Sequence, residues 1–427
     1  MEHKRSNSIL MVFASVFFIF GCTSPAKDSL TDSDGSASAF NSSYTTSDFA
    51  LLSDTSPTKE TLESPIAASA DTLPVITAQV AKDSSKADQI QSRNQARVIF
   101  SGHSLTTDAV PTIRAIASEK GNDLIDVYQV IPGSPMRNRT RGMSPTNDNS
   151  WDGYREGTPN GLNLVSEFRS PTQLPSGERY DTLVVTERHD ILSTVEWEST
   201  TSLLRHFHDR LLESSASGRT YFYNSWLSID KSNPAPWIAY ELDSLMTWEC
   251  VSSKVNDTLE VDGLSPNVRT LGVGWALARM VQSALNLEIP GLTGNSQQDI
   301  LNQIFSDNVH LAAIGQLYVG AFSYSEIFGQ PPSGFTIPND VSQETGEALL
   351  EMAWRLTQEY KARGNSHSHD MGACRDHISN NLCETYWNYF FGRDEFVGSC
   401  RSFFGNESAG NPFTNDMSNW KVWPTPQ

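Results

Sequence analysis

The sequence lacks any basic stripe. Its 427 residues carry 31 Lys and Arg against 50 Asp and Glu, which gives a formal net charge of −19 at neutral pH. Proteins that bind nucleic acid gather Lys and Arg on one face or along one element. We therefore expect no nucleic-acid partner. The acidic balance indicates a soluble surface but does not by itself indicate a fold.

Cysteine is scarce, and its spacing does not match the paired C-x-x-C pattern of a structural zinc site. Besides Cys22, the chain holds four cysteines: Cys250, Cys374, Cys383 and Cys400. An even number in an exported chain predicts two disulfides, with three possible pairings. Three of them cluster late, so at least one bond should join the tail to the main domain. Zinc is the alternative use of these cysteines, but we expect no metal and no other cofactor.

A long membrane-spanning run is also missing from the N-terminus. The apolar run over residues 9–20 follows Lys4 and Arg5, is too short to span a bilayer comfortably, and has the anatomy of a signal peptide. The Ile-Phe-Gly-Cys stretch that ends at Cys22 resembles a bacterial lipoprotein processing site. The resemblance implies that residues 1–21 are removed and that Cys22 becomes the lipidated first residue. The alternative is an ordinary cleaved signal in which Cys22 is incidental.

The lipoprotein resemblance also implies a location. Thr23 follows Cys22, so the Asp that signals retention in the inner membrane is absent. We expect an exported protein anchored to the bacterial cell envelope through Cys22, in the outer membrane if the cell is Gram-negative. Residues 22–92 are rich in Ser, Thr, Asp and Ala and poor in aromatics. Such a composition cannot bury a core and predicts a disordered tether.

From residue 93 onward, short apolar runs alternate with helix-like segments. The alternation predicts an α/β domain over residues 93–330, with a parallel sheet covered on both faces. A helix and a disulfide-bearing tail are expected over residues 331–427, and a long irregular insertion over residues 136–179. The predicted strands cover residues 96–102, 124–131, 182–186, 220–223 and 268–273. The predicted helices cover residues 111–120, 193–213, 276–287, 310–327 and 344–363.

A serine follows the first predicted strand. That strand ends at Gly102, and Ser104 stands in the turn toward the next helix, at the sheet edge where open α/β sheets bind ligands. A serine there can act as a nucleophile if a base reaches it. Far along the chain, Asp307 and His310 stand three residues apart, so on a helical turn they face the same side. This spacing lets a carboxylate orient an imidazole toward Ser104.

The Gly-His-Ser-Leu stretch around Ser104 and the Asp-x-x-His motif of Asp307 and His310 together resemble the SGNH, or GDSL-type, hydrolase family. The resemblance covers roughly residues 95–330. It implies a flavodoxin-like three-layer α/β/α sandwich and a serine esterase that needs no metal. It assigns nucleophilic attack to Ser104, proton transfer to His310 and orientation of the imidazole to Asp307. His103 stands where the family's name has Asp.

The resemblance also implies an oxyanion hole. Its donors would be the backbone N–H of Ser104, Gly133 after the second strand, and a residue after the third strand. The family has an asparagine at the last place, whereas this chain reads Glu-Arg-His-Asp, with His189 at the asparagine's position. His189 or the neighbouring Arg188 would then donate to the oxyanion. The alternative for His189 is an ordinary polar residue in a turn.

Arginines close to the expected oxyanion glycine suggest recognition of an anionic substrate. Because Arg binds carboxylate or sulfate in bidentate fashion, we predict substrate contacts from Arg137, Arg139 and Arg188. Salt bridging within an acidic protein is the alternative. Trp226, together with Trp151 and Tyr154, is a candidate wall for stacking on sugar rings, and ordinary packing is its alternative.

The sequence thus predicts an exported serine esterase that hydrolyses an ester, such as an O-acetyl group on a glycan or another small ester. A second hypothesis is a non-catalytic carbohydrate-binding surface lipoprotein on a degenerate hydrolase scaffold, which the missing asparagine motivates. A third is an acyltransferase that uses the same serine. The sequence makes no prediction of the oligomeric state.

Overall fold

A computed structural model describes residues 92–142, 151–363, 368–407 and 410–414. The predicted signal peptide, Cys22 and nearly all of the predicted tether lie outside these residues. The described residues belong to one compact unit, Val80–Gln427. None of the helices within the described ranges has the length and apolar character needed to cross a bilayer.

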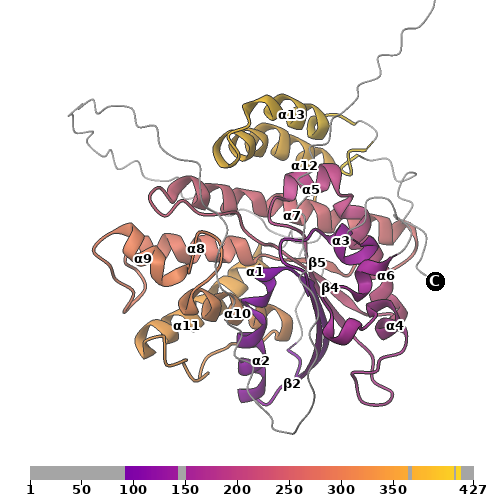
Figure 1. The fold of residues 1–427 in the computed structure, drawn as a ribbon, viewed down its shortest axis with the longest axis horizontal. Helices are drawn as coiled ribbons and strands as arrows, with labels where there is room; N and C mark the ends of the chain where they lie inside the picture. Colours follow the sequence, from indigo (N-terminus) through magenta and orange to yellow (C-terminus); the bar gives the residue numbers. More distant parts are fainter. Residues whose placement is uncertain (1–91, 143–150, 364–367, 408–409, 415–427) are drawn as a thin grey trace, which may run out of the picture. The chain divides into compact units, whose positions relative to one another are not determined.

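Five parallel strands form the centre of the fold (Figure 1), in the order β2-β1-β3-β4-β5. Gly102 pairs with Val130, and Thr186 with Tyr223, so the carboxyl ends of the strands meet at one edge. The sequence prediction of a parallel α/β sheet is confirmed. The strands are β1 (Gln95–Gly102), β2 (Asp123–Val130), β3 (Thr182–Thr186), β4 (Arg219–Tyr223) and β5 (Val268–Leu271).

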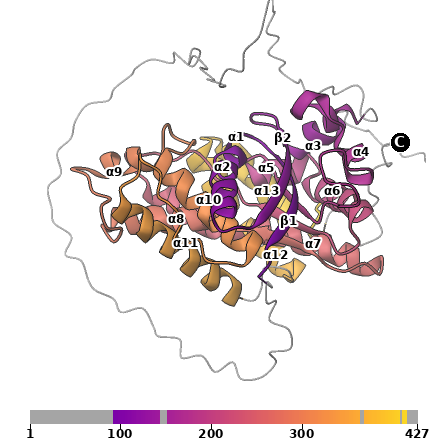
Figure 2. The same ribbon diagram turned by 90° about the horizontal axis from the view of Figure 1, so that it is seen from below.

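Helices cover both faces of the sheet. Figures 1 and 2 show α2 (Val110–Glu119) and α10 (Ala313–Phe328) on one side, and α4 (Leu164–Arg169) and α6 (Thr200–Ser214) on the other. This change of side between the first and second crossovers is what right-handed connections produce in a doubly wound sheet. The remaining helices of this part are α1 (Ser104–Thr107), α3 (Met136–Arg141), α5 (Ile191–Trp197), α7 (Ala235–Val261), α8 (Val273–Leu285) and α9 (Gln297–Ile304).

The C-terminal segment packs onto the same unit. α11 (Gln343–Ala362) lies against α10, and α12 (Met371–His377) lies against α7. The disulfide Cys250–Cys374 joins α7 to α12, and Cys383–Cys400 closes a loop within the tail. The prediction that a disulfide joins the tail to the main domain is therefore confirmed. The tail also holds η3 (Ile378–Leu382), η4 (Thr385–Phe390), η5 (Asp394–Phe396) and α13 (Val397–Gly405).

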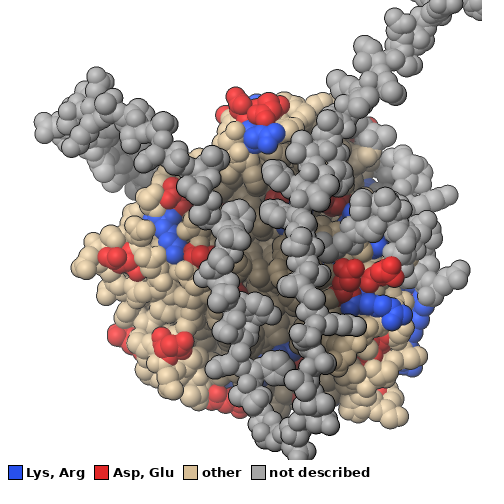
Figure 3. All heavy atoms as spheres, viewed as in Figure 1, with Lys and Arg blue, Asp and Glu red and all other residues tan. Residues whose placement is uncertain are grey.

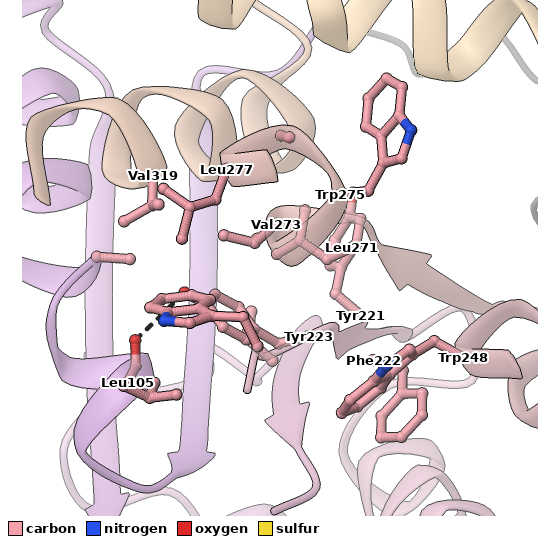
Figure 4. Packing of buried hydrophobic residues seen from close by; sticks show 14 of the residues in the cluster. Leu105, Tyr221, Phe222, Tyr223, Trp248, Leu271, Val273, Trp275, Leu277 and Val319 are labelled. Atoms are coloured by element: carbon pink, nitrogen blue, oxygen red, sulfur yellow. Dashed lines mark hydrogen bonds between the residues drawn. The ribbon is translucent and has the colours of Figure 1, made fainter. Parts of the chain in front are cut away.

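The core fixes the short helix α1 against the sheet. Figure 4 shows Leu105 of α1 and Tyr223 of β4 near Leu277 and Val319, and all four side chains are buried. The Tyr223 hydroxyl donates a hydrogen bond to the Leu105 backbone oxygen at 3.2 Å. Because α1 begins at Ser104, this contact also holds the candidate nucleophile at the carboxyl end of the sheet.

Three elements differ from the sequence prediction. The helix predicted over residues 193–213 is two helices, α5 and α6, because Ser199 between them has a left-handed φ of 57°. The insertion predicted as irregular over residues 136–179 contains α3, α4 and two short helices, η1 (Asp152–Arg155) and η2 (Pro159–Gly161). The 27-residue helix α7 has no counterpart in the prediction.

Surface charges are mixed on the face that Figure 3 shows. Lys and Arg side chains lie beside Asp and Glu there and do not gather into one basic patch. Buried arginines are also paired with acidic side chains, as in Arg97–Asp123 at 2.5 Å and Arg205–Asp262 at 2.6 Å.

Candidate active site

Ser104 stands at the carboxyl end of β1, as the first residue of α1. The turn that presents it is tight, because a Cβ atom at Gly102 would overlap the side chain of Thr106. Glycine is therefore the residue that fits between the strand and the helix. The Ser104 side chain is half-buried at this edge of the sheet.

His103 holds this turn in place. Its Nδ1 accepts the N–H of Leu105 at 3.4 Å, and its Nε2 lies 3.0 Å from the backbone oxygen of Glu187. Since a carbonyl oxygen only accepts, Nε2 is the protonated nitrogen. Burial, and secondly the charge of Arg139, lower the pKa of His103 to about 3. The imidazole is therefore neutral at pH 7 and acts as the cap of α1.

His310 lies between Ser104 and Asp307. Its Nε2 is 3.0 Å from Ser104 Oγ, and its Nδ1 is 2.7 Å from Asp307 Oδ2. Asp307 Oδ1 accepts the backbone N–H groups of Val309 and His310 at 2.7 and 2.6 Å. Partial burial opposes the change, but these hydrogen bonds lower the pKa of Asp307, so its carboxylate is ionised at neutral pH. The sequence prediction that these three residues meet is confirmed.

The loop that carries His310 is held from outside. The Trp226 indole Nε1 donates to the Val309 oxygen at 2.8 Å, and the Ile229 N–H donates to the Asn308 oxygen at 2.8 Å. Trp226 is fully buried. The prediction that Trp226 contacts substrate is therefore corrected. Its indole instead holds the loop over residues 306–311, which carries His310 and is called the base loop below.

We expect Trp226→Phe to slow reaction at Ser104, because the Val309 oxygen loses its donor and the loop gains freedom. The rate of Ser104 labelling by a fluorophosphonate should fall about 10-fold, and the free energy of unfolding by about 1–3 kcal/mol. A quenched time course of fluorophosphonate labelling measures the rate, and denaturant unfolding measures the stability.

Trp237→Phe is the matched control for this prediction. Trp237 is also fully buried, and its Nε1 donates to the Leu227 oxygen at 2.7 Å. It should lose similar stability without slower labelling. Equal labelling by the two variants would contradict a positioning role for Trp226.

The loop after β2 lies beside the Ser104 turn. The Ile131 N–H donates to the Gly102 oxygen at 3.1 Å, and Gly133 follows in an exposed turn with a φ of 63°. The Ser134 N–H closes this turn on the Ile131 oxygen at 3.2 Å. Gly133 therefore lies two residues beyond the contact between this loop and Gly102, and its role as an oxyanion donor stays a prediction.

The loop after β3 brings His189 to the same edge. Its ring centroid lies 6.3 Å from that of His103, and its side chain is half-buried. Burial lowers the pKa of His189, and the charge of His310 contributes to this lowering. A neutral imidazole at this place keeps one ring N–H for donation.

Arg139 lies beneath these loops and not on their surface. It is fully buried, and its guanidinium donates to Ser101 Oγ at 3.2 Å, to the Ser134 oxygen at 2.8 Å and to the Thr186 oxygen. The prediction that Arg139 binds substrate is therefore corrected. Its hydrogen bonds tie the end of β1 to the loops after β2 and β3.

Glu187 is a buried carboxyl group that the sequence analysis did not single out. It accepts the N–H groups of Met136 and Arg188 at 2.9 and 2.7 Å and the Thr200 hydroxyl at 3.0 Å. Burial raises the pKa of Glu187 to about 7, against the opposing charge of Arg139. Its position directly after β3 was the available signal, since polar residues at strand ends border the ligand edge of such sheets.

The other predicted substrate residues have mixed placements. Arg188 is half-buried and pairs with Asp190 through bonds of 2.5 and 2.9 Å, while Arg137 is half-buried on α3. Trp151 and Tyr154 are buried, which corrects their candidacy as a stacking wall. Arg137 and Arg188 are thus the predicted contacts that keep partial access to solvent.

No group of three or more His, Cys, Asp or Glu side chains arranged to hold a metal ion occurs in the part of the chain that the structure describes. Comparison with protein-family models, with curated proteins and with solved structures finds no match to this chain.

Proposed function

We propose that this chain is an SGNH-type serine esterase in which Ser104 is the nucleophile, His310 the general base and Asp307 the orienting carboxylate. The observation that carries the proposal is the continuous hydrogen-bonded line from Ser104 Oγ through His310 to Asp307, at 3.0 and 2.7 Å. A nucleophile, a base within reach and a third group that orients the base define this kind of site on unrelated folds. The strand order β2-β1-β3-β4-β5 supports the flavodoxin-like arrangement of the proposed family.

In the proposed reaction, Ser104 Oγ attacks the ester carbonyl carbon while its proton passes to His310 Nε2. The bond from the carbonyl carbon to the alkoxy oxygen then breaks, and His310 returns the proton to the departing alcohol. Water attacks the acyl-serine in the second half, giving one proton to His310, which returns it to Ser104 as the carboxylic acid leaves. Asp307 stabilises the imidazolium that forms in each half.

The oxyanion would be held by the Ser104 N–H, the Gly133 N–H and the neutral imidazole of His189. The half-buried, uncharged state of His189 supports this assignment. One such donor is typically worth about 2.7–4 kcal/mol of transition-state stabilisation. Because Arg188 is paired with Asp190, His189 is the better candidate for the third donor.

We further propose an exported, lipid-anchored enzyme attached to the cell envelope at Cys22 and acting on O-acetyl groups of a glycan or another small ester. The two disulfides support an oxidising compartment. Arg137, half-buried on α3, would contact an ester carried on an anionic chain.

A fluorophosphonate probe tests the proposed nucleophile. We expect the full chain to be labelled stoichiometrically, and mass-spectrometric mapping to place the adduct on Ser104. Heat-denatured protein serves as the control, because an unassembled Ser–His pair has no activated hydroxyl. Labelling at another serine, or none on folded protein, would contradict the esterase proposal.

The second candidate is a carbohydrate-binding surface lipoprotein, favoured by His189 at the asparagine's position. Glycan binding by pure protein without turnover and without Ser104 labelling would support it. The third is an acyltransferase, for which product analysis with an added alcohol acceptor would find the transferred ester in place of free acid.

A further inference from the structure

Asp108 links the nucleophile to the base. It is the C-cap residue of α1, the four-residue helix that begins with Ser104. Its Oδ2 accepts the N–H of Leu311 at 3.2 Å, and Leu311 directly follows His310. One carboxyl group therefore joins the two segments that must meet for catalysis, although they are 203 residues apart along the chain.

We propose that Asp108 is a positioning residue for the Ser104–His310 pair. It anchors the end of the base loop to the helix that carries the nucleophile, and it places a second negative charge near the imidazolium that forms during turnover. The inference rests on the proposed esterase function and extends it, because neither the Ser–His–Asp line nor the oxyanion donors include this residue.

The hydrogen bonds of the base loop support this role. Asp307 satisfies the N–H groups of Val309 and His310 from within the loop, while Asp108 satisfies the next N–H, that of Leu311, from outside. The Asp307 bonds shape the turn but do not fix its distance from Ser104. Trp226 and Ile229 hold the loop from the segment after β4, whereas the Asp108 bond ties it directly to α1, the helix that carries Ser104. A displacement of about 1 Å in such a pair can cost on the order of 100-fold in rate.

The charge of Asp108 depends on its surroundings. The groups that face it are His310 and Asp307 from the base loop, the Leu311 N–H, and Tyr223 from β4. Burial raises the pKa of Asp108 to about 6, Asp307 adds to the rise, and the Leu311 N–H and His310 oppose it. The carboxylate is therefore ionised above about pH 6 and becomes neutral as the pH falls through that value. The Asp108 carboxylate should therefore stabilise the imidazolium of His310 above pH 6, and this stabilisation should be lost below pH 6.

The test compares Asp108→Asn and Asp108→Ala in the full chain. Asn keeps an acceptor for the Leu311 N–H but carries no charge, whereas Ala removes both. The rate constant of Ser104 labelling by a fluorophosphonate is measured from pH 4 to 9, and thermal unfolding is recorded for each variant. At pH 8 we expect about a 10-fold loss for Asn and about a 100-fold loss for Ala. The Asn variant should also lack the component of the pH profile near pH 6.

Asp340→Asn is the matched control. It makes the same Asp-to-Asn change at an exposed position between α10 and α11, outside the base loop and α1. It should label like the unaltered chain at every pH. Equal labelling by Asp108→Asn and the unaltered chain, with the same pH profile, would overturn the positioning role while leaving the esterase proposal intact. Absence of labelling in the unaltered chain would instead overturn the esterase proposal, and the positioning role with it.

Discussion

Replacing Ser104 with alanine should abolish ester turnover, lowering kcat on 4-nitrophenyl acetate by roughly 10⁴- to 10⁶-fold. The Ser104 hydroxyl is the group that His310 Nε2 reaches at 3.0 Å, so its removal leaves the base without a nucleophile to activate. Initial rates with the purified chain measure the loss. Thermal unfolding should be nearly unchanged, because the side chain is half-buried and α1 is held by Leu105.

A companion variant and a control sharpen this result. Asp307→Asn should keep the fold and lower kcat by roughly 10⁴-fold, since an amide no longer orients the His310 tautomer that accepts the proton. Ser118→Ala, at an exposed position of α2, should leave the rate unchanged. A Ser104→Ala protein that keeps a tenth or more of the activity would remove the proposed mechanism.

Removing the disulfide between α7 and α12 should lower the free energy of unfolding more than removing the disulfide within the tail. Cys250 and Cys374 are 124 residues apart, whereas Cys383 and Cys400 are 17 apart. Since a longer closed loop restricts the unfolded chain more, the first bond should contribute about 5 kcal/mol and the second about 3 kcal/mol. Guanidinium unfolding of the Cys250→Ala/Cys374→Ala and Cys383→Ala/Cys400→Ala double variants measures both quantities.

The comparison of these two variants carries its own control. All four cysteines are buried, so both double variants lose similar packing and differ mainly in loop length. The Cys250→Ala/Cys374→Ala protein should unfold at the lower denaturant concentration. The reverse order would show that local packing in the tail outweighs the entropy of the longer loop.

The sheet was predictable from the sequence because its strands are short runs rich in β-branched or aromatic residues, and most of them are followed by glycine or a polar residue. The run that ends at Gly102 is completely buried after its first residue, which matches the continuous apolar character expected of a parallel strand. Helix α7 was harder to foresee. Its buried residues lie on all sides of the helix and include Glu241, Ser252 and Lys254, so no apolar stripe marks it.

The Ser–His–Asp line could be predicted because Ser104 directly follows a recognisable strand, and the three-residue spacing of Asp307 and His310 is a local property of the sequence. Substrate contacts could not, because burial depends on packing between distant segments. Arg139 and Trp226 follow strands that end at the site, so the sequence predicts that they lie near it, but both are fully buried. In the structure their N–H groups donate to the backbone oxygens of Ser134 and Val309. The positions of these oxygens depend on the fold and cannot be deduced from local sequence.

Ser104 can be activated only after His310, far along the chain, has been made and packed beside it. The two side chains that share a hydrogen bond are 206 residues apart, and α10 follows the second of them directly. A nascent polypeptide therefore holds an inert serine until the 206 residues from Ser104 to His310 have been made and folded together. In a chain cut short before His310, Ser104 would have no imidazole beside it and would react like an ordinary surface serine.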